Sequence, residues 1–147
     1  MEIWKGERRP TIKSVMTPFP HSVEIDAPVA RAREIMRQYD MLHVPVEEGG
    51  ELVGVATHLD IERRVAAAGG EESAIRVRDV YVGDPYVVDL NTPLDRVLYE
   101  MADRQVDATL VVRKGKLVGV FTVMDACRLL AQLVRSRFLR PGGDDAA

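Results

Sequence analysis

Two copies of a Thr-x-x-Asp pattern carry the side chains best suited to chemistry in this sequence. The string Leu-Val-Gly-Val-x-Thr-x-x-Asp ends in Thr57 and Asp60 in its first copy and in Thr122 and Asp125 in its second. Each string predicts a strand that leads into a helix. As a variant capping box, the threonine accepts a backbone N–H and the acid favours the positive helix end. As a ligand site, the free N–H groups and the hydroxyl bind a phosphate, and the carboxylate accepts both hydroxyls of a ribose diol. Taken alone the pattern favours the cap, whereas its duplication favours a paired site.

The two strings belong to a longer internal repeat. Shifting the sequence by 65 positions aligns residues 15–63 with residues 80–128 without a gap. A period preserved over this length indicates a duplicated folding unit. Identical pairs occur along both copies and include Val15/Val80, Pro20/Pro85, Pro28/Pro93, Met36/Met101, Gly54/Gly119 and Arg63/Arg128.

Each copy predicts the order β-α-β-β-α. Short apolar runs predict strands over 22–25, 43–47 and 52–56 in the first copy, and over 86–90, 109–113 and 117–121 in the second. Glycines between the last two strands of each copy predict hairpin turns. A three-stranded sheet of this size leaves one face uncovered. We therefore expect an α/β (α+β) fold in which the two repeats pack about a pseudo-twofold axis into one compact domain.

The helices have recognisable start and stop signals. A proline near the first turn predicts a helix in each copy, with Thr92 as the cap in the second. The last helix is expected to run to about Phe138, and its apolar side, which includes Leu130 and Val134, is interpreted as core. Cys127 is expected to be a small buried side chain. The predicted organisation is an N-terminal arm over 1–10, repeats over 11–70 and 71–138, and a flexible tail over 139–147.

Composition excludes several classes of protein. The 147 residues suit one soluble domain, and no apolar run approaches the length of a membrane span. A lone cysteine excludes an internal disulfide, and the three histidines have no metal-ligand spacing. These features and the lack of a secretory signal predict a cytoplasmic protein. The net charge of −3 predicts binding to neither nucleic acid nor membrane.

The whole span from about Thr11 to Leu133 resembles a CBS-domain pair, also called a Bateman module. The matching motifs are Val15-Met16-Thr17-Pro18, His43-Val44-Pro45-Val46 and the two Leu-Val-Gly-Val-x-Thr-x-x-Asp endings. The resemblance implies that AMP, ADP, ATP or S-adenosylmethionine binds in clefts between the repeats. It also implies homodimers.

Family positions carried over to this sequence assign two clefts, in which the aspartate holds the ribose and the threonine faces the phosphate. One would combine Thr122 and Asp125 with Thr17, His21, Leu42 and His43; the other would combine Thr57 and Asp60 with Tyr86, Val87, Asp107 and Ala108. His43 offers a phosphate partner when protonated, whereas the carboxylate of Asp107 repels phosphate. We therefore expect the Thr122/Asp125 cleft to bind more tightly.

Two functions follow from these patterns. The first is a regulatory sensor that binds an adenosine-containing ligand and signals to a separate, unidentified protein. The second is a ligand-free structural or oligomerisation module whose Thr-x-x-Asp motifs are only helix caps. An enzyme is not expected, because the sequence holds no nucleophile elbow, P-loop or metal-ligand spacing, and no cofactor is required.

Overall fold

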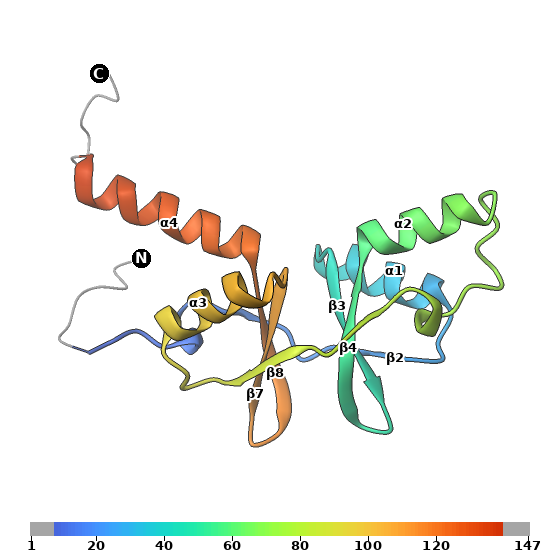
Figure 1. Ribbon diagram of the computed structural model, residues 1–147, viewed down its shortest axis with the longest axis horizontal. Helices are drawn as coiled ribbons and strands as arrows, with labels where there is room; N and C mark the ends of the chain where they lie inside the picture. The colour runs from blue at the N-terminus through green and yellow to red at the C-terminus, as the bar shows by residue number, and fades with distance from the viewer. Residues whose placement is uncertain (1–7, 140–147) are drawn as a thin grey trace. The chain divides into compact units, whose positions relative to one another are not determined.

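The computed structural model describes residues 8–139 and has the predicted α/β composition (Figure 1). Every predicted strand and helix is found within a few residues of its expected bounds, so the fold class is confirmed. Two short 3-10 helices and two further strands, β1 and β5, are additional. The elements are η1 (Ile12–Ser14), β1 (Thr17–Pro18), β2 (Val23–Glu24), α1 (Val29–Tyr39), β3 (His43–Glu48), β4 (Glu51–Thr57), α2 (His58–Ala67), η2 (Val77–Asp79), β5 (Val82–Gly83), β6 (Tyr86–Asp89), α3 (Leu94–Arg104), β7 (Ala108–Arg113), β8 (Lys116–Thr122) and α4 (Val123–Phe138).

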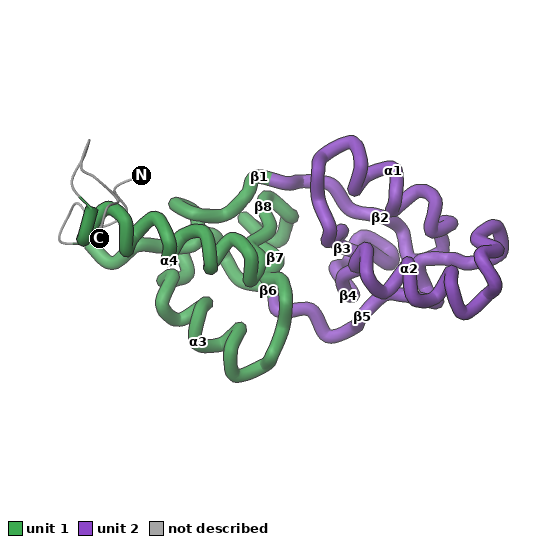
Figure 2. The backbone as a smooth tube through the Cα atoms, turned by 90° about the horizontal axis from the view of Figure 1, so that it is seen from above, with its two compact units in different colours: residues 1–18, 87–147 green, residues 19–86 purple. Residues whose placement is uncertain are grey.

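The chain divides into two compact units that do not coincide with the sequence repeats. Unit 1 contains Met1–Pro18 and Val87–Ala147, and unit 2 contains Phe19–Tyr86 (Figure 2). The sheet of unit 1 has the strand order β1-β8-β7-β6, and that of unit 2 has the order β2-β3-β4-β5. The expected three-stranded sheets are therefore wrong, since each sheet has four strands. The additional edge strand comes from the start of the other repeat.

Both exchanged edge strands pair antiparallel with a long central strand. In unit 1, Thr17 of β1 lies opposite Val120 of β8. In unit 2, Val82 of β5 lies opposite Val55 of β4. The β3–β4 and β7–β8 hairpins form the centres of the sheets, with an irregularity at matching positions, Val46/Glu47 and Val111/Val112.

Each unit buries its own apolar core. The helical spacing of apolar residues that predicts α1 and α3 is confirmed, because these residues are the ones that the helices bury. The central strands of the hairpins are buried on both faces. Each fully buried aliphatic or aromatic side chain contributes about 1.5–3 kcal/mol to folding. The largest fully buried side chains are Phe121, Ile12, Ile61, Leu94, Leu110, Val29, Val44, Val46, Val77, Val97, Val111 and Val120.

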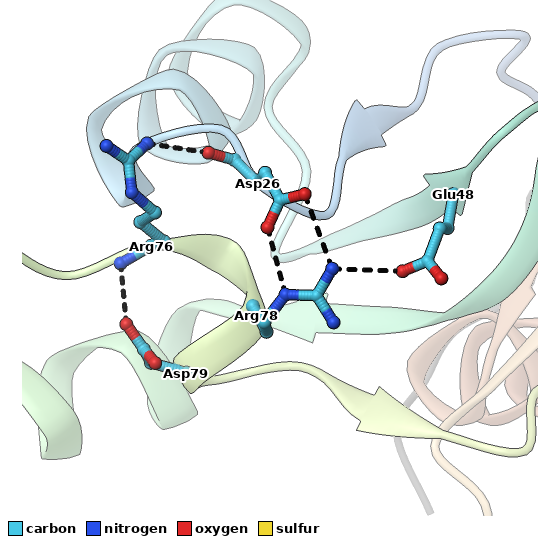
Figure 3. Close-up of polar contacts among 5 residues, drawn as sticks. All are labelled: Asp26, Glu48, Arg76, Arg78 and Asp79. Carbon is cyan, nitrogen blue, oxygen red and sulfur yellow. Dashed lines mark hydrogen bonds and ion pairs between the residues drawn. The ribbon is translucent and has the colours of Figure 1, made fainter.

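Within unit 2, ion pairs of Arg78 hold η2 against the segments that contain Asp26 and Glu48 (Figure 3). Arg78 binds Asp26 through Nε at 2.9 Å and reaches Glu48 through Nη2 at 3.1 Å. The backbone N–H of Arg78 also donates to the carbonyl of Ile25 at 2.7 Å. The Arg78 guanidinium lowers the pKa of the Asp26 carboxyl below its ordinary value by hydrogen bonding. In unit 1, Arg9 forms a bidentate ion pair with Asp95, in which Nε donates to Oδ1 at 2.8 Å and Nη2 donates to Oδ2 at 2.6 Å.

Three sequence-based predictions about caps and core are wrong. Thr92 does not cap α3: the N-cap is Pro93, and the carbonyl of Thr92 accepts the N–H of Ile12 instead. Cys127 is exposed. Leu129 is the only buried residue of α4 among those described, while Leu130 and Val134 are 61% and 48% exposed. The last helix therefore contacts its own unit along a narrow stripe.

Within residues 8–139, no helix combines the length and apolarity needed to cross a membrane. The predicted N-terminal arm falls mostly outside the described residues, as does the predicted tail beyond residue 139.

Candidate functional site

The two Thr-x-x-Asp motifs lie at the starts of equivalent helices. Thr57 is the N-cap of α2, and its Oγ1 accepts the N–H of Asp60 at 3.1 Å. Thr122 is the N-cap of α4, and its Oγ1 accepts the N–H of Asp125 at 3.2 Å. Both strands end in extended backbone at the threonine, so the change from strand to helix occurs at the predicted place. The capping role of both threonines is therefore observed.

The two aspartates are used differently. Oδ2 of Asp125 accepts the N–H of Thr122 at 2.9 Å, which completes a capping box, and Oδ1 lies 3.5 Å from Nη1 of Arg128. The Asp60 carboxylate has neither contact, and no hydrogen bond or ion pair to it occurs among the described residues. The capping-box interpretation thus holds in full for the second motif and only for the threonine in the first.

The residue just before β3 and the residue just before β7 each accept a backbone hydrogen bond from the first residue of a helix. The carbonyl of Leu42 accepts the N–H of His58, the first residue of α2, at 2.9 Å. In the second repeat the carbonyl of Asp107 accepts the N–H of Val123 at the same distance. Leu42 and Asp107 are exposed, so their side chains face away from the cores. Both positions therefore have exposed side chains directly beside a Thr-x-x-Asp motif.

The first residue of β3 and the first residue of β7 each lie opposite the threonine of their own repeat's motif. His43 is paired in register with Thr57, and Ala108 is paired with Thr122. His43 is partly exposed and Ala108 is buried. His43 therefore brings a titratable ring next to its own repeat's motif, at a place where the second repeat has only a methyl group.

His21 belongs to a small aromatic cluster in unit 2. Its ring stacks on Tyr39 with centroids 4.1 Å apart, and Phe19 meets both rings edge-on. Aromatic contacts of this kind stabilise by about 0.5–1.5 kcal/mol beyond burial. This stacking gives His21 a structural role that the sequence pattern did not indicate.

The candidate residues are divided between the units. Each predicted cleft takes half of its residues from unit 1 and half from unit 2. Unit 1 contains Thr17, Val87, Asp107, Ala108, Thr122 and Asp125; unit 2 contains His21, Leu42, His43, Thr57, Asp60 and Tyr86. The joining of these halves into two clefts stays a prediction.

Two hollows lie within unit 2 beside the candidate residues. One, of about 380 Å³, is bordered by Asp60 and by two arginines of α2, Arg63 and Arg64, with η2 and β5 on its other side. The other, of about 310 Å³, is bordered by Leu42, His58 and the end of α1. The two arginines were not among the predicted site residues. The sequence could have indicated them, because Arg63 and Arg64 follow Asp60 by three and four residues and residues at that spacing share a face of a helix.

Metal binding has no support in the part of the chain that the structure describes. No group of three or more His, Cys, Asp or Glu side chains there is arranged to hold a metal ion.

Comparison with known proteins agrees with the architecture. The sequence pattern of the family described as CBS domain matches residues 12–67 and 77–132. The uncharacterized protein MJ1404 of Methanocaldococcus jannaschii is 30% identical over 79% of this chain and 25% of its own length. A homoserine O-acetyltransferase of Methanococcoides burtonii is 29% identical over 82% of this chain and 24% of its own length. The chain thus spans about a quarter of the length of these two relatives.

Solved structures share the fold over most of the chain. An uncharacterized conserved protein of Pyrococcus horikoshii has 30% identity and a TM-score of 0.69, covering 85% of this chain and 95% of its own. The CBS domain pair of protein MJ0100, solved with 5′-methylthioadenosine and S-adenosyl-L-methionine, has 21% identity and a TM-score of 0.72, covering 86% and 99%. The hexameric CBS-CP12 protein of bloom-forming cyanobacteria has 22% identity and a TM-score of 0.74, covering 92% and 79%. All three likenesses extend across both sequence repeats.

Proposed function

Because this chain belongs to the CBS-domain family and carries two CBS domains in tandem, we propose that it is a regulatory module that binds an adenosine-containing ligand, AMP, ADP or ATP, in clefts between its repeats. Ligand binding changes the relation of the repeats, and a separate protein responds to the new surface. The ligand achieves this only if it binds one arrangement more tightly than the other.

The single observation that carries this proposal is the state of Asp60. Its carboxylate is not used by the cap of α2, and it borders a hollow together with two arginines. A residue kept only as a helix cap would be expected to accept backbone N–H groups, as Asp125 does. The adenosine-derived ligands of the MJ0100 domain pair add support from a protein of the same fold. No catalytic group forms part of the proposal, and no cofactor is required.

The experiment that tests the proposal is isothermal titration of the purified protein with AMP, ADP, ATP and S-adenosylmethionine. Saturable heat from one of these ligands, accompanied by a rise in melting temperature, establishes the sensor and identifies its ligand, because a ligand that binds only the native state must stabilise it. Absence of heat from all four, with folded protein verified by circular dichroism, refutes it.

The second candidate function is a ligand-free oligomerisation module, which the exposed face of α4 favours. Phe138 is 77% exposed, and Leu130 and Val134 continue the same apolar stripe. A second copy of the chain is the occupant that we propose for this stripe, as a homodimer. Light scattering of wild type and of a Leu130→Glu/Val134→Glu variant tests the homodimer: a dimer that becomes a monomer supports it, and an unchanged mass refutes it.

A further inference from the structure

We propose that the two Thr-x-x-Asp motifs have diverged in role, so that the Asp60 hollow selects a nucleotide for its phosphate while Asp125 serves only the start of α4. This inference rests on the proposed function and deepens it, because it specifies which motif binds the ligand and which chemical class of ligand it binds. It also reverses the order of affinity that the sequence alone suggests.

The internal repeat provides a matched comparison between the motifs. Asp60 and Arg63 are equivalent by position to Asp125 and Arg128. In the second repeat the pair is in contact, with Nη1 of Arg128 at 3.5 Å from Asp125. In the first repeat no such contact is formed between the described side chains of Asp60 and Arg63. The same residue types are thus in contact in the second repeat and apart in the first.

Asp60 has the properties that a ribose diol requires. Its side chain is partly buried at the first turn of α2. Both carboxylate oxygens are available to accept hydroxyl hydrogens, since no donor within residues 8–139 occupies them. The adjoining hollow of about 380 Å³ is open to solvent, so a ligand can reach the carboxylate from outside.

Arg63 and Arg64 supply the preference for phosphate. Both line the hollow, are exposed and make no ion pair with the part of the chain described here. Guanidinium groups bind phosphate oxygens through charge-assisted, often bidentate hydrogen bonds. Asp79 also borders the hollow, but its Oδ2 accepts the N–H of Arg76 at 2.9 Å. The hollow therefore has the carboxylates of Asp60 and Asp79 and the guanidinium groups of Arg63 and Arg64 on its border. The two guanidinium groups can bind a phosphate, which favours a nucleoside monophosphate over an uncharged nucleoside or a sulfonium ligand.

Asp125 lacks this freedom. Its two oxygens are held by the N–H of Thr122 and by Arg128. A ligand would have to displace an intramolecular hydrogen bond that caps α4, and the cost of that displacement would weaken binding. The side chain is therefore assigned to stability rather than to recognition.

The test is isothermal titration with AMP, adenosine and S-adenosylmethionine on wild type, Asp60→Asn, Asp125→Asn and Arg63→Gln/Arg64→Gln. We expect one AMP per chain, and a Kd at least tenfold higher in Asp60→Asn but within about twofold of wild type in Asp125→Asn. In the double arginine variant we expect the Kd for AMP to rise at least tenfold and that for adenosine to change less than twofold. Circular dichroism verifies the fold of each variant. Because Arg63 and Arg64 are exposed, we expect their double variant to fold as the wild type does.

Several results would overturn the inference while leaving the sensor intact. These are two AMP per chain, loss of AMP in Asp125→Asn but not in Asp60→Asn, equal weakening of AMP and adenosine in the arginine variant, or tighter binding of S-adenosylmethionine than of AMP. No heat from these three ligands but saturable heat from ADP or ATP would also overturn the inference alone. No heat from any of them, ADP and ATP included, refutes the proposed function itself, so the two failures are distinguishable.

Discussion

Replacing Gly54 by alanine should destabilise the protein far more than the equivalent change at Gly119. A Cβ at Gly54 would lie 2.2 Å from the carbonyl oxygen of Val82 and 2.6 Å from the Tyr81 ring. Because the closest atom is backbone, the new methyl group must push β5 away from β4. Overpacking costs about 1–3 kcal/mol, and each lost backbone hydrogen bond adds about 0.5–1.5 kcal/mol. We therefore expect Gly54→Ala to lower the free energy of unfolding by about 3 kcal/mol.

The second repeat and β5 itself supply the controls. A Cβ at Gly119 would meet Sδ of Met16 at 2.5 Å and the carbonyl oxygen of Thr17 at 3.0 Å. The methionine end is flexible and can move aside, so we expect Gly119→Ala to cost about 1 kcal/mol. Gly83 lies opposite Gly54, but a Cβ there would meet nothing closer than 3.9 Å. Gly83→Ala should therefore leave stability unchanged or raise it by about 0.5 kcal/mol.

Urea unfolding followed by circular dichroism measures all three variants. At constant m-value the shift in midpoint reports the change in stability directly. Equal losses in Gly54→Ala and Gly119→Ala would contradict the reasoning, because the two motifs are identical in sequence around the glycine and differ only in what approaches it. A loss in Gly83→Ala as large as that in Gly54→Ala would show that flexibility of β5, rather than close approach, decides the outcome.

Three further predictions concern single polar groups. Thr109 is fully buried, its hydroxyl has no partner among the described residues, and the equivalent position of the first repeat is Val44. Thr109→Val should therefore raise the free energy of unfolding in urea by about 1 kcal/mol, and a loss of stability would contradict the absence of a hydrogen bond. The lowered pKa of Asp26 beside Arg78 contributes stability that is fully present above about pH 4 and is lost as the pH falls through the lowered pKa. Asp26→Asn should therefore flatten the fall in urea midpoint below about pH 4, and an unchanged profile would exclude this pair as its source. Asp125→Ala should cost about 1 kcal/mol at pH 7 through the lost capping box, measured as a lower melting temperature, and an unchanged melting temperature would count against that cap.

The repeat made much of the fold predictable from the sequence. Hairpin strands, helix starts and the buried stripes of α1 and α3 follow from local patterns that occur twice, so each copy supports the other. The exchanged strands were not predictable in this way. Thr17–Pro18 and Val82–Gly83 have two residues each, which is too short for any periodicity. Their pairing depends on close approach to Gly119 and Gly54, which only the folded structure shows.

The candidate site was predictable in its residue types but not in its asymmetry. The sequence identified both aspartates and both caps from one repeated string. It contains no signal for the rotamers that commit Asp125 to Thr122 and leave Asp60 facing a hollow. It likewise assigned α4 to the core from its apolar residues, although one helix can carry two apolar faces and bury only one.

The strand exchange also sets an order of events during synthesis. Unit 2 is one continuous stretch, Phe19–Tyr86, so all of its strands are present as soon as that stretch has left the ribosome. Unit 1 is discontinuous, and Thr17 must wait for Val120, about a hundred residues later, before its edge strand can pair. Pairing over such a distance carries a loop-closure cost that slows folding. Thr17 and Pro18 are thus among the last residues to find their partners, whereas every strand of unit 2 can pair earlier in synthesis.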